Sequence, residues 1–255
     1  MNDPIADAAA VALAGELVVM PTDTVYGVGT RPDDAAATAR LFEAKGRPRE
    51  LALPVLVASR AAAEEVAAFD DRARSLAGRF WPGPLSLVLP RTARSRGWDL
   101  GEAADTIAVR MPHHPLALAL LARSGPLAVT SANRTGEATP TTCDGLRAVF
   151  GDLVEVYLCE GSQPEGLAST VVDLTAPELR FVRVGAIAEA DELLEGERST
   201  RGFRHGVRHL VAMLGRHREH EVGCANVLGP QAPGSVARDV HTELLGGGDG
   251  LRHRA

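Results

Sequence analysis

The stretch GELVVMPTDTVYGVGTRPDDAAATARLFEAKG, residues 15–46, places an apolar strand and a helix on either side of a polar segment. The strand is expected over residues 16–20 and ends at Pro21. The helix is expected from an N-cap at Asp33 to Ala44, with Gly46 as its stop signal. A strand followed by a helix is the repeating unit of α/β proteins, so this stretch predicts that fold class.

The same alternation continues in both directions. An Ala-rich helix is expected before the first strand, and further helices after it, at residues 5–14, 61–68, 71–80, 116–123 and 142–150. Further strands are expected at residues 54–58, 85–89, 106–110, 127–130, 154–158, 169–174 and 180–184. The late strands follow one another with little helix between them, which disfavours a purely parallel sheet. We therefore expect a twisted, mixed parallel/antiparallel open sheet flanked by helices.

The last sixty residues differ from the rest of the chain. From Arg198 onward there are nine Arg against five acidic residues, whereas the first 197 residues carry a net charge of −10. Six of the eight His also lie in this stretch, and the apolar periodicity weakens. We expect a domain over residues 1–195 and an Arg/His/Gly-rich extension over residues 196–255 that is partly ordered at most.

Composition excludes several classes of protein. The 255 residues carry a net charge of −6 and are 45% apolar, which is typical of a globular chain with a sizeable core. No secretory signal and no apolar run of about 18 residues is found, so no membrane span is expected. The three cysteines, Cys143, Cys159 and Cys224, are far apart and odd in number. They predict neither a disulfide framework nor a metal site, and they fit a cytoplasmic location.

Polar side chains gather at the ends of the expected strands. The segment Thr22–Tyr26 follows the first strand, Arg110 ends the strand at 106–110, and residues 130–142 follow the next. Ligands of open α/β sheets bind at such places. The segment after the first strand could instead be an ordinary turn with Asx-type hydrogen bonds. For Arg110, two partners stay open: an internal acid or the carboxylate of a ligand.

Lys45 is the single lysine among 27 basic residues, and it lies in the run Lys45-Gly46-Arg47-Pro48-Arg49. Such cations could cap the C-terminus of the preceding helix. Three cations held by Gly and Pro favour a polyphosphate ligand instead. No phosphate-loop motif and no nucleophile–base pair is found. The pattern therefore indicates binding of a nucleotide and a small zwitterion, with catalysis by positioning and charge neutralisation.

Seven segments, covering roughly residues 10–190 in order, together resemble the threonylcarbamoyl-AMP synthase family, whose fold is YrdC-like. They are PTDTVYG (21–27), KGRP (45–48), FWPGPLSLVL (80–89), TIAVRMP (106–112), TSAN with GEATPTT (130–142), STVVDL (169–174) and RVGAI (183–187). The resemblance implies a nucleotidyltransferase that converts L-threonine, bicarbonate or CO2, and ATP into L-threonylcarbamoyladenylate and pyrophosphate. Mg2+ is the expected companion of ATP. The product would serve N6-threonylcarbamoyladenosine synthesis in tRNA.

The resemblance also implies roles for individual residues. The threonine contacts would be Thr24, Arg110, Ser169 and the backbone at Val129. The ATP contacts would be Lys45, Arg47, Thr106, Ser131, Asn133, Thr139 and Arg183, with Lys45 and Arg47 as the catalytic pair facing the phosphates. Leu51, Leu56 or Val57, and Val184 stand where the family often has polar residues. The departures at Leu51 and at Leu56 or Val57 weaken one ATP contact and one threonine contact.

Two other functions compete with this one. A non-catalytic tRNA or double-stranded RNA binding module on the same fold is disfavoured because the domain is strongly acidic, and RNA affinity rests largely on phosphate neutralisation. A related carbamoyl-adenylate enzyme of hydrogenase maturation would need an acylphosphatase-like segment and zinc-finger motifs, which this chain lacks. Contact with tRNA, or with a complex that transfers the threonylcarbamoyl group to tRNA, stays open, as do oligomeric state and strictness for threonine.

Overall fold

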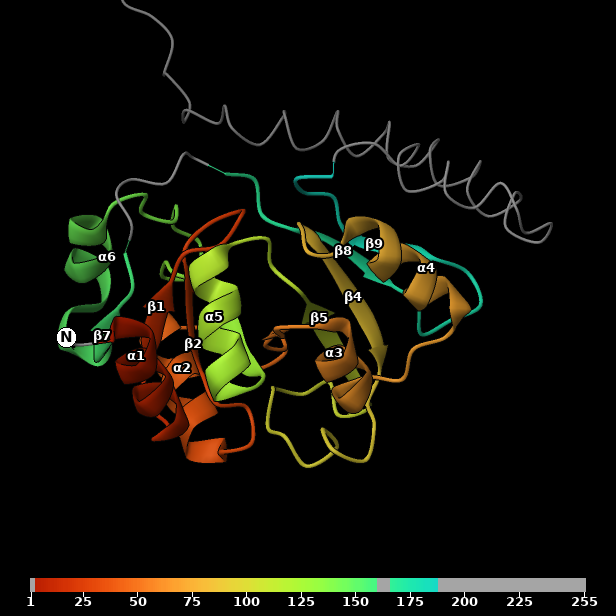
Figure 1. The fold of residues 1–255 in the computed structure, drawn as a ribbon, viewed down its shortest axis with the longest axis horizontal. Helices are drawn as coiled ribbons and strands as arrows, with labels where there is room; N and C mark the ends of the chain where they lie inside the picture. Colours follow the sequence, from red (N-terminus) through yellow and green to blue (C-terminus); the bar gives the residue numbers. More distant parts are fainter. Residues whose placement is uncertain (1–2, 160–165, 188–255) are drawn as a thin grey trace, which may run out of the picture. The chain divides into compact units, whose positions relative to one another are not determined.

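The computed structural model describes residues 3–159 and 166–187 (Figure 1). Its strands are β1 (Val18–Met20), β2 (Gly27–Thr30), β3 (Val55–Leu56), β4 (Leu85–Pro90), β5 (Thr106–Arg110), β6 (Leu127–Ser131), β7 (Val156–Tyr157), β8 (Thr170–Asp173) and β9 (Arg180–Arg183). Its helices are α1 (Pro4–Leu13), α2 (Ala35–Lys45), α3 (Arg60–Val66), α4 (Asp71–Phe80), α5 (Pro115–Ser124), α6 (Cys143–Phe150) and the 3₁₀ turn η1 (Gly151–Leu153). Every helix and strand predicted in this part of the chain is present; α4 and β5 have the predicted bounds, and the others have shifted ends.

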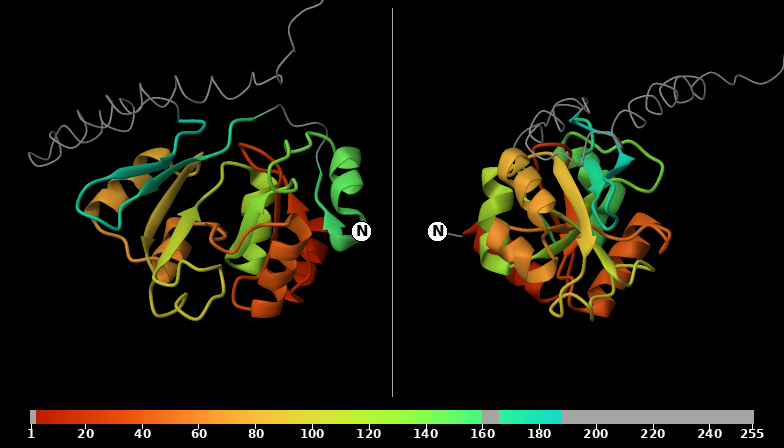
Figure 2. Two further views of the ribbon diagram at one scale, coloured as in Figure 1. Left: turned by 180° about the vertical axis from the view of Figure 1, so that it is seen from behind. Right: turned by 90° about the vertical axis from the view of Figure 1, so that its right-hand side faces the viewer.

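The described strands form one sheet in the order β7-β1-β2-β6-β3-β5-β4-β8-β9. Figure 2 shows β7 and β9 at opposite ends of it. The pairs β1–β7, β3–β5 and β4–β8 are parallel, and the other five neighbouring pairs are antiparallel. The prediction of a mixed α/β sheet flanked by helices is therefore confirmed.

The sheet separates two apolar clusters because side chains alternate between the faces of a strand. In β1, Val19 belongs to one cluster, and its neighbours Val18 and Met20 belong to the other. The first cluster includes buried residues of α2, α3, α4 and α6, and the second those of α1 and α5. Helices α1 and α5 lie side by side (Figure 1).

Strand β2 was not predicted from the sequence. It contains Gly27 and Gly29, and glycine is depleted in strands. A Cβ atom at Gly27 would lie 2.6 Å from Cγ1 of Val129, and one at Gly29 would lie 2.6 Å from the carbonyl oxygen of Ala128. These glycines therefore allow β2 to approach β6 closely, which brings the polar segment before β2 next to the end of β6.

Helix α2 begins one residue later than predicted. The carboxylate of Asp34 caps it by accepting hydrogen bonds from the backbone N–H groups of Ala36 and Ala37. Asp33 instead accepts a hydrogen bond from Nε of Arg31 at 2.8 Å. The predicted stop is confirmed, since Gly46 has a φ of +61°, a conformation that glycine adopts without strain. Lys45 is therefore the last residue of the helix.

The expectation of no disulfide was wrong. Cys143 begins α6 and Cys159 follows β7, and the two are joined, with Cα atoms 5.7 Å apart. Helix α6 and η1 return the chain on itself, so two cysteines 16 residues apart meet. The spacing of the cysteines along the sequence did not predict this disulfide. Cys224 lies outside the described residues.

Reducing this disulfide should lower the free energy of unfolding by about 3 kcal/mol. The bond closes a loop in the unfolded chain, and without it the unfolded chain gains conformational entropy. Urea denaturation with and without reductant measures the difference. A Cys143→Ser, Cys159→Ser variant should match the reduced protein. A Cys224→Ser variant, which keeps the bond, should still respond to reductant. Identical unfolding curves in both conditions would contradict the pairing.

In residues 3–159 and 166–187, no helix is long and apolar enough to cross a membrane. The predicted extension over residues 196–255, together with residues 188–195 of the predicted domain, lies outside the described residues. So do the six histidines of that extension.

Candidate functional site

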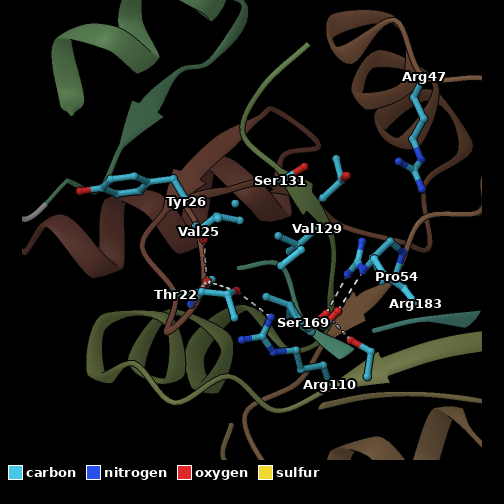
Figure 3. Close-up of a pocket in the computed structure, with 16 residues that line it drawn as sticks. Thr22, Val25, Tyr26, Arg47, Pro54, Arg110, Val129, Ser131, Ser169 and Arg183 are labelled. Atoms are coloured by element: carbon cyan, nitrogen blue, oxygen red, sulfur yellow. Dashed lines mark hydrogen bonds between the residues drawn. The ribbon is translucent and has the colours of Figure 1, made fainter. Parts of the chain in front are cut away.

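A pocket lies where the segment before β2 meets β3, β4 and β6, next to the residues before β8 and the end of β9. Seven of the predicted site residues line it: Thr24, Arg47, Arg110, Val129, Ser131, Ser169 and Arg183. Figure 3 shows Arg47 and Arg183 on one side of the pocket and Arg110 with Thr22 on the other. These seven predicted residues come from six separate segments of the chain and meet at one place.

Arg110 ends β5 and is almost fully buried, with 6% of its surface exposed. Its Nε donates to the carbonyl oxygen of Gly83 at 3.0 Å, and its two terminal nitrogens donate to Oγ1 of Thr24 at 3.0 Å and to Oδ1 of Asp23 at 2.6 Å. Burial lowers the pKa of Arg110, while the charge of Asp23 opposes that shift. An internal acid therefore does pair with Arg110, which was one of the two open alternatives.

The Arg110 guanidinium has more N–H donors than its contacts with the protein use. An arginine carries five N–H donors, and the contacts just described use one on each nitrogen. Asp23 is itself held, because its Oδ1 also accepts the backbone N–H of His113 at 2.9 Å. The carboxylate thus fixes the orientation of the guanidinium in the pocket wall, where a second anion can approach it.

Arg183 contacts Ser169 in the pocket lining, and Figure 3 shows the two side by side. Nε of Arg183 donates to the carbonyl oxygen of Ser169 at 2.9 Å, and NH2 donates to its Oγ at 3.0 Å. That Oγ lies 3.0 Å from Oγ of Ser86. Both serines are buried, so these hydrogen bonds exist in a poorly solvated environment where they are strong.

Arg47 and Arg183 give the pocket positive charge. Arg47 donates to the carbonyl oxygens of Leu51 at 2.6 Å and Ala52 at 3.0 Å. Burial lowers the pKa of both guanidinium groups, and the charge of Arg183 lowers that of Arg47 further. No ion pair found in the described part of the chain involves either arginine. Two partly desolvated cations in one pocket favour an anionic ligand.

Lys45 is buried, with 3% of its surface exposed, and does not line the pocket. Its Nζ donates to the carbonyl oxygens of Ser131 at 2.8 Å and Asn133 at 2.7 Å. The side-chain oxygens of both residues lie within 3.3 Å of the same atom. Burial, helped by the charge of Arg47, lowers the pKa of Lys45 to about 8. The ammonium group thus holds the turn that follows β6, and its predicted contact with ATP stays a prediction.

Three further predicted ATP contacts also lie outside the pocket lining. Asn133 and Thr139 are joined, since Oγ1 of Thr139 donates to Oδ1 of Asn133 at 3.2 Å, so both extend the turn held by Lys45. Thr106 begins β5, four residues and therefore about 13 Å before Arg110. Its carbonyl oxygen accepts a hydrogen bond from Arg91. The structure does not bring Thr106 to the pocket.

Sequence reasoning missed two features of the site, Asp23 and Ser86. Asp23 lies in the polar segment after β1, but its partner could not be read from spacing. Ser86 is the one polar residue in the apolar run LSLVL of β4, a signal that could have marked it. Leu56, noted as a departure, lines the pocket and makes its wall apolar. The other departures, Leu51 and Val184, are exposed.

Comparisons with known proteins agree on one family. Residues 10–185 match the Sua5/YciO/YrdC family model, which is described as telomere recombination. A Mycobacterium leprae (strain TN) protein, provisionally assigned as a threonylcarbamoyl-AMP synthase, is 48% identical over 187 residues, 73% of this chain and 84% of that relative. Threonylcarbamoyl-AMP synthase of Pyrococcus abyssi is 42% identical over 175 residues, 68% of this chain and 51% of that protein.

Solved structures show the same fold. P. abyssi Sua5 complexed with L-threonine matches with a TM-score of 0.67 and 38% identity, covering 74% of this chain and 57% of that one. Escherichia coli YciO matches with a TM-score of 0.66 and 26% identity, covering 71% of this chain and 88% of that one.

Proposed function

Since this chain belongs to the Sua5/YciO/YrdC family, we propose that it makes L-threonylcarbamoyladenylate and pyrophosphate from L-threonine, bicarbonate or CO2, and ATP. The observation that carries the proposal is the pocket, with buried Arg110 on one side and Arg47 and Arg183 on the other, two cations that form no ion pair with any described residue. A zwitterion and a polyphosphate are the two ligands that such a division of charge accommodates.

The amino acid would bind beside Arg110. The guanidinium, oriented by Asp23, would hold the carboxylate of L-threonine, with Thr24 and Ser169 contributing hydroxyls. The apolar wall of Leu56 and Val129 suits a small side chain that ends in a methyl group. The P. abyssi relative solved with L-threonine supports this choice of amino acid.

The triphosphate would bind on the side of Arg47 and Arg183. The neutral amine of threonine adds to the carbon of CO2 and releases a proton to solvent, and an oxygen of the resulting carbamate attacks the α-phosphorus of ATP. A new P–O bond forms as the bond from that phosphorus to the bridging oxygen breaks, and pyrophosphate leaves. The two guanidinium groups would neutralise the charge that develops on the phosphate oxygens.

Mg2+ is proposed to enter with ATP. No described residue of the pocket lining carries a carboxylate, and residues 3–159 and 166–187 hold no group of three potential metal ligands. The residues present therefore do not build a metal site of their own, and the ion would be bound by the phosphates.

The test is pyrophosphate release from ATP with each of the twenty amino acids, with and without bicarbonate. We expect release only with threonine and bicarbonate together, and a product with the mass of threonylcarbamoyl-AMP. Release without any amino acid, or no release, would overturn the proposal. A salt-dependent gel shift with tRNA in the absence of turnover would favour RNA binding without chemistry instead.

Arg47→Ala and Arg183→Ala should each raise the KM for ATP by about tenfold to a hundredfold, because each removes a cation from the phosphate side. Arg49→Ala is the matched control. Arg49 is two residues from Arg47, but it is exposed and pairs with Asp99, so its loss should change little. Steady-state kinetics with ATP varied distinguishes them. Equal effects of all three substitutions would contradict the assignment.

The product is proposed to serve threonylcarbamoylation of tRNA in the cytoplasm, by contact with tRNA or with a tRNA-threonylcarbamoyl transferase complex. Disulfides are usually reduced in that compartment. Neither Cys143 nor Cys159 lines the pocket, so pyrophosphate release should not require their bond.

A further inference from the structure

Ser86 is a buried hydroxyl in an otherwise apolar strand. In β4 the side chains of Leu85, Leu87 and Leu89 point to one face and are at most 1% exposed. Ser86 points to the other face, is 4% exposed and lines the pocket. A buried serine needs a hydrogen-bond partner, because an unpaired hydroxyl in such a place destabilises the fold. The partner is the hydroxyl of Ser169, at 3.0 Å.

The backbone holds the two serines together. Strands β4 and β8 are parallel, with Ser86 opposite Val171, and the N–H of Thr170 donates to the carbonyl oxygen of Pro84 at 2.9 Å. Ser169, two residues before Val171, points to the same side as Ser86. Thr170 points the other way and donates its hydroxyl to the carbonyl oxygen of Ile187. The pair is therefore built into the sheet.

The protons of this pair can be counted. An arginine only donates, so the oxygen of Ser169 is the acceptor for Arg183. Two hydroxyls that share one hydrogen bond use one of their two protons, and the other proton remains for a ligand. When Ser86 donates, the oxygen of Ser169 accepts from both neighbours, and the proton of Ser169, which lines the pocket, is available to a ligand there.

We propose that Ser86 is a positioning residue of the amino-acid subsite: its hydroxyl orients that of Ser169, so that Ser169 donates to an oxygen atom of the bound substrate. A carboxylate or carbamate oxygen is the acceptor that such a donor fits. The inference rests on the proposed function, since it concerns the same pocket. Ser86 itself acts through Ser169.

The variants Ser86→Thr and Ser86→Val test the hydroxyl at nearly constant shape, because threonine carries a hydroxyl group where valine carries a methyl group. The valine variant should raise the KM for L-threonine about tenfold, with kcat and the KM for ATP within twofold of the unmodified protein. The threonine variant should restore most of that loss. Equal KM values for the two variants would overturn the inference.

Two further variants separate positioning from stability. Ser95→Ala is the matched control, since Ser95 is a fully buried serine that donates to the carbonyl oxygen of Val66 away from the pocket. It should lower the melting temperature without raising the KM for threonine. In a Ser169→Ala background, Ser86→Ala should raise the KM for L-threonine little further. Fully additive effects of the two substitutions on this KM would contradict the coupling of the two hydroxyls.

Measurements on the unmodified protein distinguish a failure of this inference from a failure of the proposed function. If it shows threonine-dependent pyrophosphate release and Ser86→Val leaves the KM for threonine unchanged, the proposed function stands and the inference fails. If the unmodified protein neither turns over nor binds L-threonine by calorimetry, the proposed function fails and the inference falls with it.

Discussion

Replacing Arg110 with alanine should lower kcat/KM for L-threonine at least about a thousandfold. The substitution removes the proposed carboxylate partner and leaves Asp23 buried without its counter-ion, since the Asp23 side chain is only 13% exposed. The free energy of unfolding should fall by about 3 kcal/mol or more for the same reason. Pyrophosphate release measures the first effect and urea denaturation the second.

Loss of stability alone must be separated from loss of the site. Arg91 is the matched control, because it is equally buried, at 6% exposure, and donates to the carbonyl oxygens of Thr106, Ser95, Trp98 and Ala103 away from the pocket. Arg91→Ala should destabilise the protein but leave the KM for threonine unchanged in the folded fraction. An Arg110→Ala protein with full activity would remove the site assignment.

Replacing Lys45 with methionine should reduce activity at least about a hundredfold, although Lys45 does not line the pocket. The ammonium group has four oxygen atoms of Ser131 and Asn133 within 3.3 Å, and removing it leaves buried carbonyl groups unpaired. The turn after β6 would then relax, and Ser131 with it. Lys45→Arg should not rescue activity, because a planar guanidinium does not fit a site built for a compact ammonium.

The same site predicts a pH dependence. The pKa of Lys45 is about 8 instead of 10.5, so the group is protonated at pH 7 and loses its proton as the pH rises through about 8. A neutral amine has one donor fewer, so activity should decline over that range. Because Lys45 is the only lysine, protein labelled with 13C-lysine gives one side-chain signal, and its titration reports this pKa directly. A midpoint near 10.5 would contradict the prediction.

Local sequence was sufficient for much of the architecture. The apolar runs, the breakers and the capping residues predicted all the described α-helices and all the described strands except β2, because these signals act over a few neighbouring residues. Seven pocket residues were also identified, since the segments that resemble the family carry them. The two glycines of β2 gave a misleading local signal, because their purpose is the approach to Val129 on another strand.

The sequence by itself determined the fold class, the element types and the charged and hydroxylic groups available to the pocket. Only the tertiary structure decided which groups meet. Lys45 reaches Asn133 across 88 residues of chain, Ser86 reaches Ser169 across 83, and Cys143 pairs with Cys159. These contacts depend on the strand order and register of the sheet, which are set by packing of the whole core and leave no periodic signal in any one segment.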